Sequence, residues 1–315
     1  MMNTSYVVLG GKGFIGSHLI EELSKSKAKI RCFDRPDPVK VAEPYLFDHA
    51  NVEVVEGDFL NEGDLRRALR GTDVCFHLVS TTLPASSNDD PIFDIETNIA
   101  GTVRLLQVCI EERVRKVIFI SSGGTVYGIP QQIPISEDHP TNPICSYGIT
   151  KLAIEKYLAL FHHLYGLDYR VLRVSNAYGE RQRIRSSQGV VAVFLAKALR
   201  DEQLEIWGDG SVVRDYIHVS DVIKALIKTT VYRGKHRIFN IGSNQGKNLN
   251  EVIAVIEKVI DRKVKKQYIK SRKFDVPVNI LDTNRARTEL KWVPETSFEE
   301  GIKRFAKWLD KKLKY

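Results

Sequence analysis

Residues 6–16 of the chain read YVVLGGKGFIG, an apolar run that ends in a glycine-rich turn. The run is typical of a buried strand, and the residues from Phe14 onward predict a helix. Side chains at Gly10, Gly13 and Gly16 would keep a bound group away from the backbone, so glycine suits all three positions. A helix that starts here directs its free N–H groups and its positive dipole end at an anion. The stretch therefore predicts a strand, a tight turn and a helix that together cradle a phosphate group.

Strand and helix signals alternate from this stretch to about residue 176. The predicted strands span residues 7–9, 30–33, 52–55, 74–78, 117–120 and 169–174. The predicted helices span residues 14–25, 61–69, 93–109 and 146–165. Strands that alternate with helices indicate an α/β fold with a doubly wound parallel sheet of the Rossmann type.

Beyond residue 176 the predicted elements are mostly helical. Helices are expected at 190–199, 219–230, 249–260 and 298–312, and short strands at 204–207 and 238–241. Proline and glycine are scattered rather than clustered, so we expect no flexible linker. We therefore expect a Rossmann domain over residues 1–176 and a smaller, mostly helical substrate lobe over residues 177–315. The lobe should pack directly on the first domain, with the chain free to cross back between them.

The composition limits the class of protein. The chain has 315 residues, of which 43% are apolar, and it contains no apolar run long enough for a transmembrane helix. No secretory signal is visible, so we expect a cytoplasmic protein. The four cysteines show neither a CxxC pattern nor a Cys/His ligand spacing, so we expect reduced thiols and no metal site.

The net charge of +8 comes from lysines and arginines that are spread along the chain, and we expect no nucleic-acid partner. The densest basic run, residues 302–314, places Ile302, Phe305, Trp308 and Leu309 on one face of a helix. This pattern favours a terminal helix that docks on the core with its basic face in solvent. Contact with an anionic membrane surface is the alternative, without stable insertion.

Two acidic residues follow the next predicted strands. Asp34 lies about 20 residues beyond the glycines, where a carboxylate accepts a hydrogen bond from a ribose 2′-hydroxyl and repels a 2′-phosphate. This predicts a dinucleotide site for NAD, while Arg35 leaves NADP as the alternative. Asp58, followed by Phe59, can meet the adenine, or it can be an ordinary turn aspartate.

Tyr147 and Lys151 lie four residues apart, on one face of the predicted helix 146–165. The pKa of a free phenol is about 10, and a base at pH 7 requires a drop of about 3 units, roughly 4 kcal/mol. An ammonium about 5 Å away supplies roughly 3 kcal/mol at an effective dielectric constant near 20. A positively charged nicotinamide can supply the rest, so the pair makes chemical sense as a tyrosine base beside NAD.

With both motifs in place, the chain resembles the extended short-chain dehydrogenase/reductases, and among them the NAD-dependent nucleotide-sugar epimerases that act on UDP-glucose or UDP-N-acetylglucosamine. The resemblance runs almost end to end. The segments that resemble the family are residues 10–18, 76–78, 98–102, 121–128, 147–151, 173–179 and 214–222.

The resemblance implies a role for each matching residue. Tyr147 would be the base and Lys151 its partner, and Ser122 and Thr125 are the candidate hydroxyls for the reacting sugar oxygen. The implied cofactor-binding residues are Gly10, Gly13, Phe14, Ile15, Gly16, Asp34, Arg35, Asp58, Phe59, Leu78, Val79, Ser80, Asn98, Ser121, Tyr147, Lys151 and Val174. The implied substrate-binding residues are Ser122, Asn176, Gln188, Val190, Glu205, Trp207, Arg214, Arg272, Asp275 and Asn279.

Within this set, Arg214 and Arg272 would pair with the diphosphate, because the arginine fork suits phosphate, although each could form an ordinary salt bridge instead. Asp275 would hold a uridine ribose hydroxyl, and the strand from Glu205 to Trp207 would line the base. His218 is expected to serve structure rather than catalysis.

Two positions depart from the family pattern. Gly123 stands where family members usually carry the serine or threonine that bonds the reacting oxygen, so Ser122, Thr125 or a water must replace it, and we favour Ser122. The same segment lacks the Asp-Glu pair of sugar 4,6-dehydratases, which argues against dehydration. Asn279 stands where glucose-restricted members often have a bulky tyrosine, and the smaller residue leaves space for a 2-acetamido group.

We therefore expect a reversible 4-epimerase of a UDP-hexose. A nucleotide-sugar reductase, a UDP-glucuronate epimerase or decarboxylase, and a non-catalytic NAD sensor are the alternatives. The resemblance also implies a homodimer through a bundle of helices 93–109 and 146–165, and a place in surface polysaccharide synthesis. Leu152, Tyr157, Leu160 and Phe161 could supply apolar contacts to this bundle or to the core. Whether the sugar is carried by UDP, dTDP or a lipid diphosphate stays open.

Overall fold

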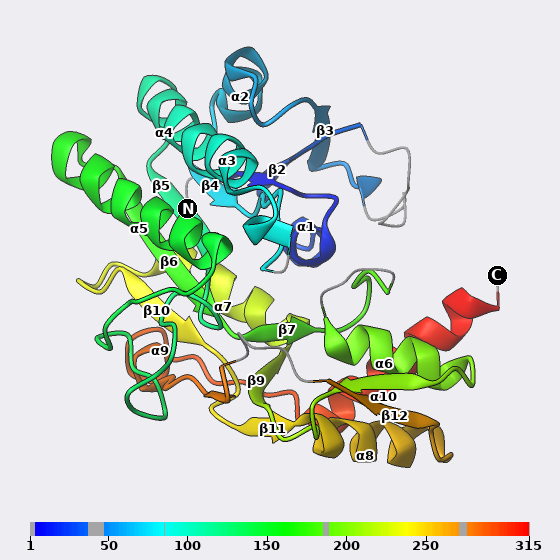
Figure 1. The fold of residues 1–315 in the computed structure, drawn as a ribbon. Coiled ribbons are helices and arrows are strands. Elements are labelled where there is room, and N and C mark those ends of the chain that lie inside the picture. Colours follow the sequence, from blue (N-terminus) through cyan, green and yellow to red (C-terminus); the bar gives the residue numbers. More distant parts are fainter. Residues whose placement is uncertain (1–3, 37–46, 85, 185–188, 271–275, 315) are drawn as a thin grey trace.

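The protein is described by a computed structural model that covers residues 4–36, 47–84, 86–184, 189–270 and 276–314. The chain forms a large α/β lobe and a smaller lobe packed below it in the view of Figure 1. The functional site lies where the two lobes meet, so the elements that build this junction are described here.

The large lobe contains a seven-stranded sheet in the order β10-β6-β5-β4-β1-β2-β3. Every neighbouring pair in it is parallel. The strands are β1 (Ser5–Leu9), β2 (Lys29–Asp34), β3 (Val52–Glu56), β4 (Val74–His77), β5 (Lys116–Ser122), β6 (Asp168–Val174) and β10 (Ile238–Ile241). The predicted doubly wound Rossmann-like sheet is therefore confirmed.

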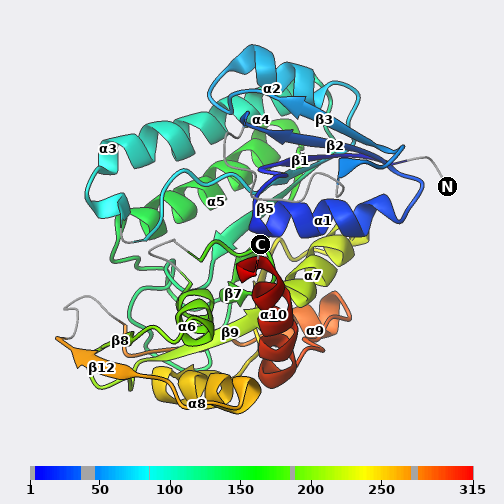
Figure 2. The same cartoon turned by 90° about the vertical axis from the view of Figure 1, so that its right-hand side faces the viewer.

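Helices cover both faces of the sheet (Figure 2). One face carries α1 (Phe14–Ser24), α7 (Val219–Val231) and α9 (Asn284–Glu289), and the other carries α2 (Glu62–Leu69), α4 (Gly101–Glu111) and α5 (Ser146–Tyr165). Successive residues of a strand point to opposite faces. Val8 accordingly joins the core beneath α1, while Val7 joins the core beneath α4 and α5, and both are fully buried. Strands buried on both faces explain the continuous apolar runs in the sequence.

The helix predicted over residues 93–109 is longer and irregular. It begins with α3 (Pro91–Asp94), continues through a π-helical turn η3 (Ile95–Ala100) and ends as α4 (Gly101–Glu111). A short 3₁₀ turn, η2 (Ser86–Asn88), precedes it. Single π turns inside α-helices occur frequently at functional sites.

The small lobe has its own apolar core between α6 (Val190–Leu199), α8 (Leu249–Ile260) and α10 (Phe298–Leu313). It also contains more strands than the sequence predicts. β11 and β13 flank β9, β7 also pairs with β9, and β8 pairs with β12. These strands are β7 (Asn176–Tyr178), β8 (Leu204–Trp207), β9 (Val213–His218), β11 (Gly246–Asn248), β12 (Lys266–Ile269) and β13 (Val278–Asn279).

The chain crosses between the lobes several times. After β9 it returns to the large lobe, where α7 packs against α1 and β10 adds the edge strand beside β6. It then builds β11 and α8 in the small lobe before α9 packs against β10. A single boundary at residue 176 therefore does not separate the two lobes.

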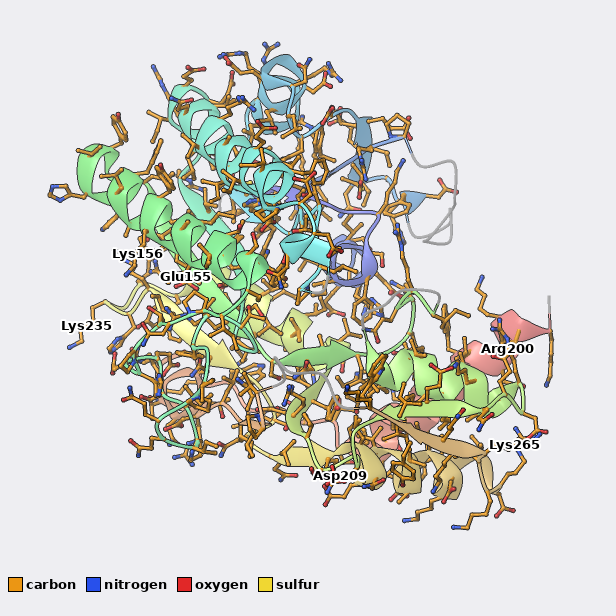
Figure 3. All side chains as sticks on the ribbon, viewed as in Figure 1. Glu155, Lys156, Arg200, Asp209, Lys235 and Lys265 are labelled. Carbon is orange, nitrogen blue, oxygen red and sulfur yellow. The ribbon has the colours of Figure 1, made fainter. Side chains whose placement is uncertain are left out.

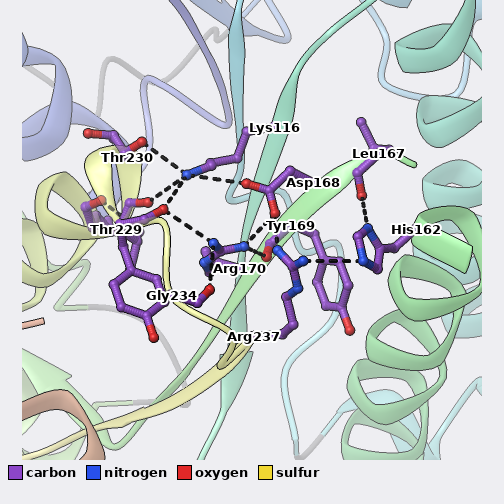
Figure 4. Close-up of polar contacts among 12 residues, drawn as sticks. Lys116, His162, Leu167, Asp168, Tyr169, Arg170, Thr229, Thr230, Gly234 and Arg237 are labelled. Atoms are coloured by element: carbon purple, nitrogen blue, oxygen red, sulfur yellow. Dashed lines mark hydrogen bonds and ion pairs between the residues drawn. The ribbon is translucent and has the colours of Figure 1, made fainter. Parts of the chain in front are cut away.

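The return of α7 is fixed by a buried polar cluster at the amino ends of β5 and β6 (Figure 4). The Lys116 ammonium donates to the carbonyls of Thr229, Thr230 and Tyr232 at the end of α7 and lies 3.4 Å from the Asp168 carboxylate. A cation suits this position because the C-terminus of a helix carries partial negative charge. The cluster lies at the edge of the sheet opposite the site.

Other expectations concern the surface and the thiols. In α10 the apolar residues Ile302, Phe305 and Leu309 are buried, as expected for a docked helix. Charged side chains are spread over both lobes, for example Lys156 on α5 and Arg200 and Lys265 on the small lobe (Figure 3). All four cysteines are free thiols. In the described ranges, no helix is long and apolar enough to cross a membrane, and no acidic, cysteine or histidine cluster could hold a metal.

Candidate active site

A cavity of about 930 Å³ opens along the carboxyl ends of the parallel strands and extends into the small lobe. It spans the point between β1 and β4 at which the strand order reverses, where ligands bind in doubly wound sheets. The glycine turn lies at one end of the cavity, the first turn of α5 in its middle, and the start of α6 with β8 and β9 at the other end.

The glycine turn has the geometry that a dinucleotide requires. Gly10 has a φ of +81°, and a Cβ atom at Gly16 would lie 2.2 Å from the Gly10 carbonyl oxygen. Neither position accepts a side chain without opening the turn. Gly13 is the N-cap of α1 and provides no side-chain cap, so the first N–H groups of the helix face the cavity. The turn therefore fits the pyrophosphate of NAD.

Asp34 is held against this turn at the end of β2. Its carboxylate accepts hydrogen bonds from the backbone N–H groups of Lys12 (2.8 Å) and Arg35 (2.9 Å). Burial raises the pKa of Asp34, and these two N–H groups oppose the shift. The Lys12 ammonium pairs with Glu56 at 2.5 Å, on the strand next to Asp34. This carboxylate lies where the adenosine ribose of NAD is expected.

The first turn of α5 places Tyr147 and Lys151 in the middle of the cavity. The Lys151 ammonium donates to the Ile120 carbonyl at 3.1 Å and lies 5.5 Å from the centre of the Tyr147 ring. The same ammonium lies 4.8 Å from the Phe119 ring. The structure thus brings the predicted pair together over the end of β5.

The pKa of Tyr147 moves against the direction that a base requires. Burial raises the pKa of this phenol to about 12, and a side-chain hydrogen bond with Ser80 offsets only part of the shift. Burial also lowers the pKa of Lys151 to about 8, against the opposing charges of Asp94 and Glu155. Without ligands, desolvation therefore dominates the pKa of Tyr147, and its lowering by Lys151 together with a nicotinamide stays a prediction.

The hydroxyls near the pair come from Ser122 and Thr125, which both line the cavity. The Thr125 Oγ1 atom is buried and has no hydrogen-bond partner among the described residues. Gly123 turns the other way: a Cβ atom there would lie 2.5 Å from a methyl group of Leu281. Glycine at position 123 is thus explained by the packing of Leu281.

The far end of the cavity brings together Asn176, Val190, Trp207 and Arg214. The Arg214 guanidinium donates to the carbonyls of Val213 (2.9 Å) and Val276 (2.5 Å), which fixes it at this wall. The adjacent Asp215 is fully buried and accepts bonds from Ser243 and from the Leu281 N–H.

Most of the predicted cofactor residues line the same cavity. They are Gly10, Gly13, Phe14, Ile15, Gly16, Asp34, Arg35, Asp58, Phe59, Leu78, Val79, Ser80, Ser121, Tyr147, Lys151 and Val174. Gln188, Arg272 and Asp275 lie outside the described residues.

Three predicted residues do not line the cavity. Asn98 is buried behind it and bonds the backbone N–H of Thr81 at 3.1 Å. Glu205 is exposed on β8. Asn279 is buried and donates to the Gly123 carbonyl at 3.1 Å. Each side chain is directed by tertiary contacts that a motif does not specify.

Other lining residues carry no sequence motif. Thr81, Leu83, Pro84, Phe93 and Arg183 also line the cavity. Residues 81–84 could be expected near the site from their position alone, because they follow the carboxyl end of β4, where ligands bind in open α/β sheets.

His218 serves structure, as expected. It caps α7, where its Nδ1 atom lies 2.8 Å from the Ser220 hydroxyl, and its Nε2 atom lies 3.1 Å from Glu180.

Comparison with known proteins is consistent with this geometry. The family described as "NAD dependent epimerase/dehydratase family" matches residues 6–242. The crystal structure of UDP-glucose 4-epimerase from Thermotoga maritima with UDP-glucose superimposes with a TM-score of 0.92, at 35% identity over 98% of this chain and 100% of the other.

Two further structures are similar. UDP-N-acetylglucosamine 4-epimerase from Methanobrevibacter ruminantium, in complex with UDP-N-acetylmuramic acid, gives a TM-score of 0.92 at 29% identity over 99% and 100% of the two chains. UDP-glucuronic acid 4-epimerase from Bacillus cereus, with UDP-glucuronic acid and NAD, superimposes with a TM-score of 0.89, at 27% identity over 99% of this chain and 100% of the other. The glycine turn, the Tyr147–Lys151 pair and the whole-chain match together show that this chain is an enzyme of the NAD-dependent epimerase/dehydratase family.

Proposed function

We propose that the protein is a reversible 4-epimerase of a UDP-hexose, either the UDP-GlcNAc/UDP-GalNAc pair, the UDP-Glc/UDP-Gal pair or both. The glycine turn and Asp34 would hold NAD, which would supply the reversible hydride acceptor for sugar C4. The observation that carries the proposal is the Tyr147–Lys151 pair, which lies in the same cavity as the glycine turn and Arg214.

The proton chemistry falls to Tyr147. As phenolate it takes the proton of the sugar 4-hydroxyl and later returns it, which gives general base and then general acid catalysis. Lys151 stabilises the phenolate by its charge. Ser122 is our choice for the hydroxyl that bonds the reacting oxygen, because Gly123 faces Leu281 instead of the cavity.

Inversion at C4 requires the keto sugar to present its other face while the nucleotide stays bound. We propose that Arg214, together with Arg272, holds the diphosphate, and that Gln188, Asp275 and Trp207 hold the nucleoside. Binding at the unreactive end would leave the sugar free to turn within the cavity of about 930 Å³.

The sugar itself is the finer part of the proposal. The argument for N-acetylated sugars rested on the small size of Asn279, and that side chain is engaged with Gly123 behind the cavity wall. Its effect on a 2-acetamido group is therefore indirect, and both sugar pairs stay in the proposal.

The test is proton NMR of the purified protein with UDP-GlcNAc, UDP-glucose or UDP-glucuronate and no added cofactor. Conversion to the matching galacto sugar is expected in at least one of the first two tubes. Tyr147→Phe should lose at least about a thousandfold in turnover while retaining NAD. Tyr165→Phe, at the exposed end of the same helix, is the matched control and should match the wild type. Unchanged turnover in Tyr147→Phe would contradict the proposal.

A second candidate is a UDP-glucuronate epimerase or decarboxylase, favoured by the similarity to the Bacillus cereus enzyme. Conversion of UDP-glucuronate alone would decide for it. A nucleotide-sugar reductase would consume added NADH or NADPH stoichiometrically, and a non-catalytic sensor would retain NAD and convert none of the sugars.

We also propose that the enzyme works as a cytoplasmic homodimer. The helices α3 to α5 expose apolar side chains at Ile92, Ile95, Tyr157, Leu160 and Leu164. Phe161, by contrast, is buried in the core of the large lobe. An uncovered apolar face of this kind marks an interaction surface. Light scattering of the purified protein should give twice the mass of one chain, and a monomer mass would contradict the dimer.

A further inference from the structure

Asp94, the last residue of α3, is a fully buried carboxylate. One of its oxygens accepts bonds from the Thr82 hydroxyl (2.5 Å) and the Asn98 amide (3.0 Å). The other accepts bonds from the hydroxyls of Ser146 and Thr150, both at 2.7 Å. Among the described residues no lysine or arginine forms an ion pair with it. A buried carboxylate must be compensated, and here hydroxyl and amide dipoles do so.

Through these donors, Asp94 connects the start of α5 with the segment that follows β4. Ser146 and Thr150 immediately precede Tyr147 and Lys151 on α5, so Asp94 holds the turn that carries both. Thr82 belongs to the segment after β4, which also lines the cavity. The same carboxylate therefore fixes the spacing between α5 and this segment.

The start of α5 has a second tie to the same region. The N–H of Ser146 donates to the Asn88 side chain at 2.9 Å, and the N–H of Tyr147 donates to the Ser87 hydroxyl at 3.0 Å. These bonds satisfy N–H groups that a helix start leaves without partners. They set where the helix begins, whereas Asp94 sets how its first turn faces the cavity.

Asp94 also contributes charge to the pair. The titratable groups that face Lys151 are Tyr147 and Glu155 on α5, His77 on β4 and Asp94 on α3. Glu155 is neutralised by Arg173 at 2.6 Å, and burial keeps His77 neutral by lowering its pKa to about 3. Asp94 is therefore the carboxylate near Lys151 that no cation neutralises within the described part of the chain.

We propose that Asp94 is a positioning residue for the Tyr147–Lys151 pair: it locks the first turn of α5 against the segment after β4 and holds the positive charge on Lys151. The inference rests on the proposed function for its kinetic consequence, but the state of Lys151 can be measured without turnover.

The first test follows the charge. Competitive labelling of Lys151 with acetic anhydride at different pH values, read by peptide mass spectrometry, reports its protonation in the full-length protein. In Asp94→Asn the labelling midpoint should fall by about 0.5 unit or more relative to the wild type. Asp90→Asn is the matched control, because Asp90 caps the same helix at an exposed site, where its carboxylate accepts a hydrogen bond from the Phe93 N–H at 2.9 Å. Equal midpoints in a folded Asp94→Asn would overturn the proposal.

The second test follows the position. Thr150→Val removes one hydroxyl from Asp94 with almost no change in volume, so it keeps the proposal testable if Asp94→Asn fails to fold. We expect at least a tenfold loss of kcat on the sugar that the wild type converts, with NAD retained and KM nearly unchanged. Wild-type kcat in Thr150→Val would overturn the positioning role.

These tests separate the two proposals. If Tyr147→Phe keeps full turnover, the proposed function fails, whereas the labelling midpoint of Lys151 still decides the role of Asp94. If Tyr147→Phe is inactive, but Asp94→Asn has the wild-type labelling midpoint and Thr150→Val has the wild-type kcat, the inference fails and the proposed function stands.

Discussion

At the scale of single residues, burial favours the neutral forms of both groups in the pair. It raises the pKa of Tyr147 to about 12 and lowers that of Lys151 to about 8. The chemistry needs a phenolate beside an ammonium. The missing stabilisation must therefore come with the ligands, and the positive charge of an oxidised nicotinamide held in this buried site would supply it. The protein alone keeps the tyrosine protonated until the cofactor is present.

The pKa of Lys151 predicts the alkaline limit of activity. Lys151 is protonated below pH 8 and loses its charge as the pH rises through about 8. We expect kcat/KM to fall above this pH, approaching tenfold per unit. The measurement is kcat/KM against pH for the converted sugar.

The Lys151→Arg variant tests whether the fall in kcat/KM comes from Lys151 or from another titrating group. Arginine stays protonated throughout this range, so Lys151→Arg should be slower but should lack the fall near pH 8. A wild-type profile that stays flat to pH 10 would show that the charge of Lys151 is not required.

At the scale of elements, the helices and central strands followed from the sequence, because each presents one or two apolar faces to a core. α5, α6 and α8 have the predicted bounds. The π turn η3 was not predicted, since no residue pattern in this stretch distinguishes it from the α-helix on either side. The strands β7 and β13 have three and two residues, too few to show a period.

The candidate site could likewise be predicted only in part. The glycine turn, Asp34 and the Tyr147–Lys151 pair could be predicted because their spacing along the chain already requires one geometry. The direction of Asn279 toward Gly123 could not, because it depends on how β13 packs beside the turn after β5. Nor could Asp94, whose partners come from three separate segments of the chain.

The turn before α1 yields a prediction about NAD. In Gly16→Ala the added methyl group would meet the Gly10 carbonyl oxygen at 2.2 Å and the Gly11 Cα atom at 2.8 Å. The turn must open, and strain of about 1–3 kcal/mol corresponds to a loss of roughly tenfold to a hundredfold in NAD affinity. The NAD content of the purified protein measures it. Gly63→Ala on α2 is the control, because its nearest neighbour is the Asn61 side chain at 3.2 Å, and its NAD content should be that of the wild type.

At the scale of the whole molecule, ion pairs tie the lobes together. Glu180, just after β7, contacts His218 at 3.1 Å and Arg304 of α10 at 3.5 Å. The neighbouring Arg181 pairs with Glu21 of α1. These contacts connect α1 of the large lobe with α10 of the small lobe through one short segment, so we expect the two lobes to unfold together.

Glu180 makes this connection sensitive to acid. Burial would raise its pKa, but the hydrogen bond from His218 and the charge of Arg304 lower it to about 2. A carboxyl whose folded pKa lies below its unfolded value of about 4.5 stabilises the fold above that value. This contribution, about 1–2 kcal/mol after allowance for solvent screening, is lost as the pH falls from about 4.5 toward 2.

Denaturant unfolding between pH 6 and pH 3 measures the effect. The free energy of unfolding of Glu180→Gln should be lower at pH 6 and should decline less steeply than that of the wild type. Glu202→Gln, at an exposed pair with Arg200 of 4.0 Å, is the control and should keep the wild-type slope. Equal slopes for Glu180→Gln and the wild type would contradict this assignment.

The repeated crossing of the chain between the lobes has a consequence for recombination. The residues proposed to hold the substrate lie in segments separated by α7 and β10, which belong to the large lobe. A chimera with a single junction near residue 176 would replace the edge strand β10 and the helices α7 and α9 together with the proposed substrate-binding residues. Transplanting the sugar preference of a relative therefore requires a cut at every crossing, or point changes made within the existing scaffold.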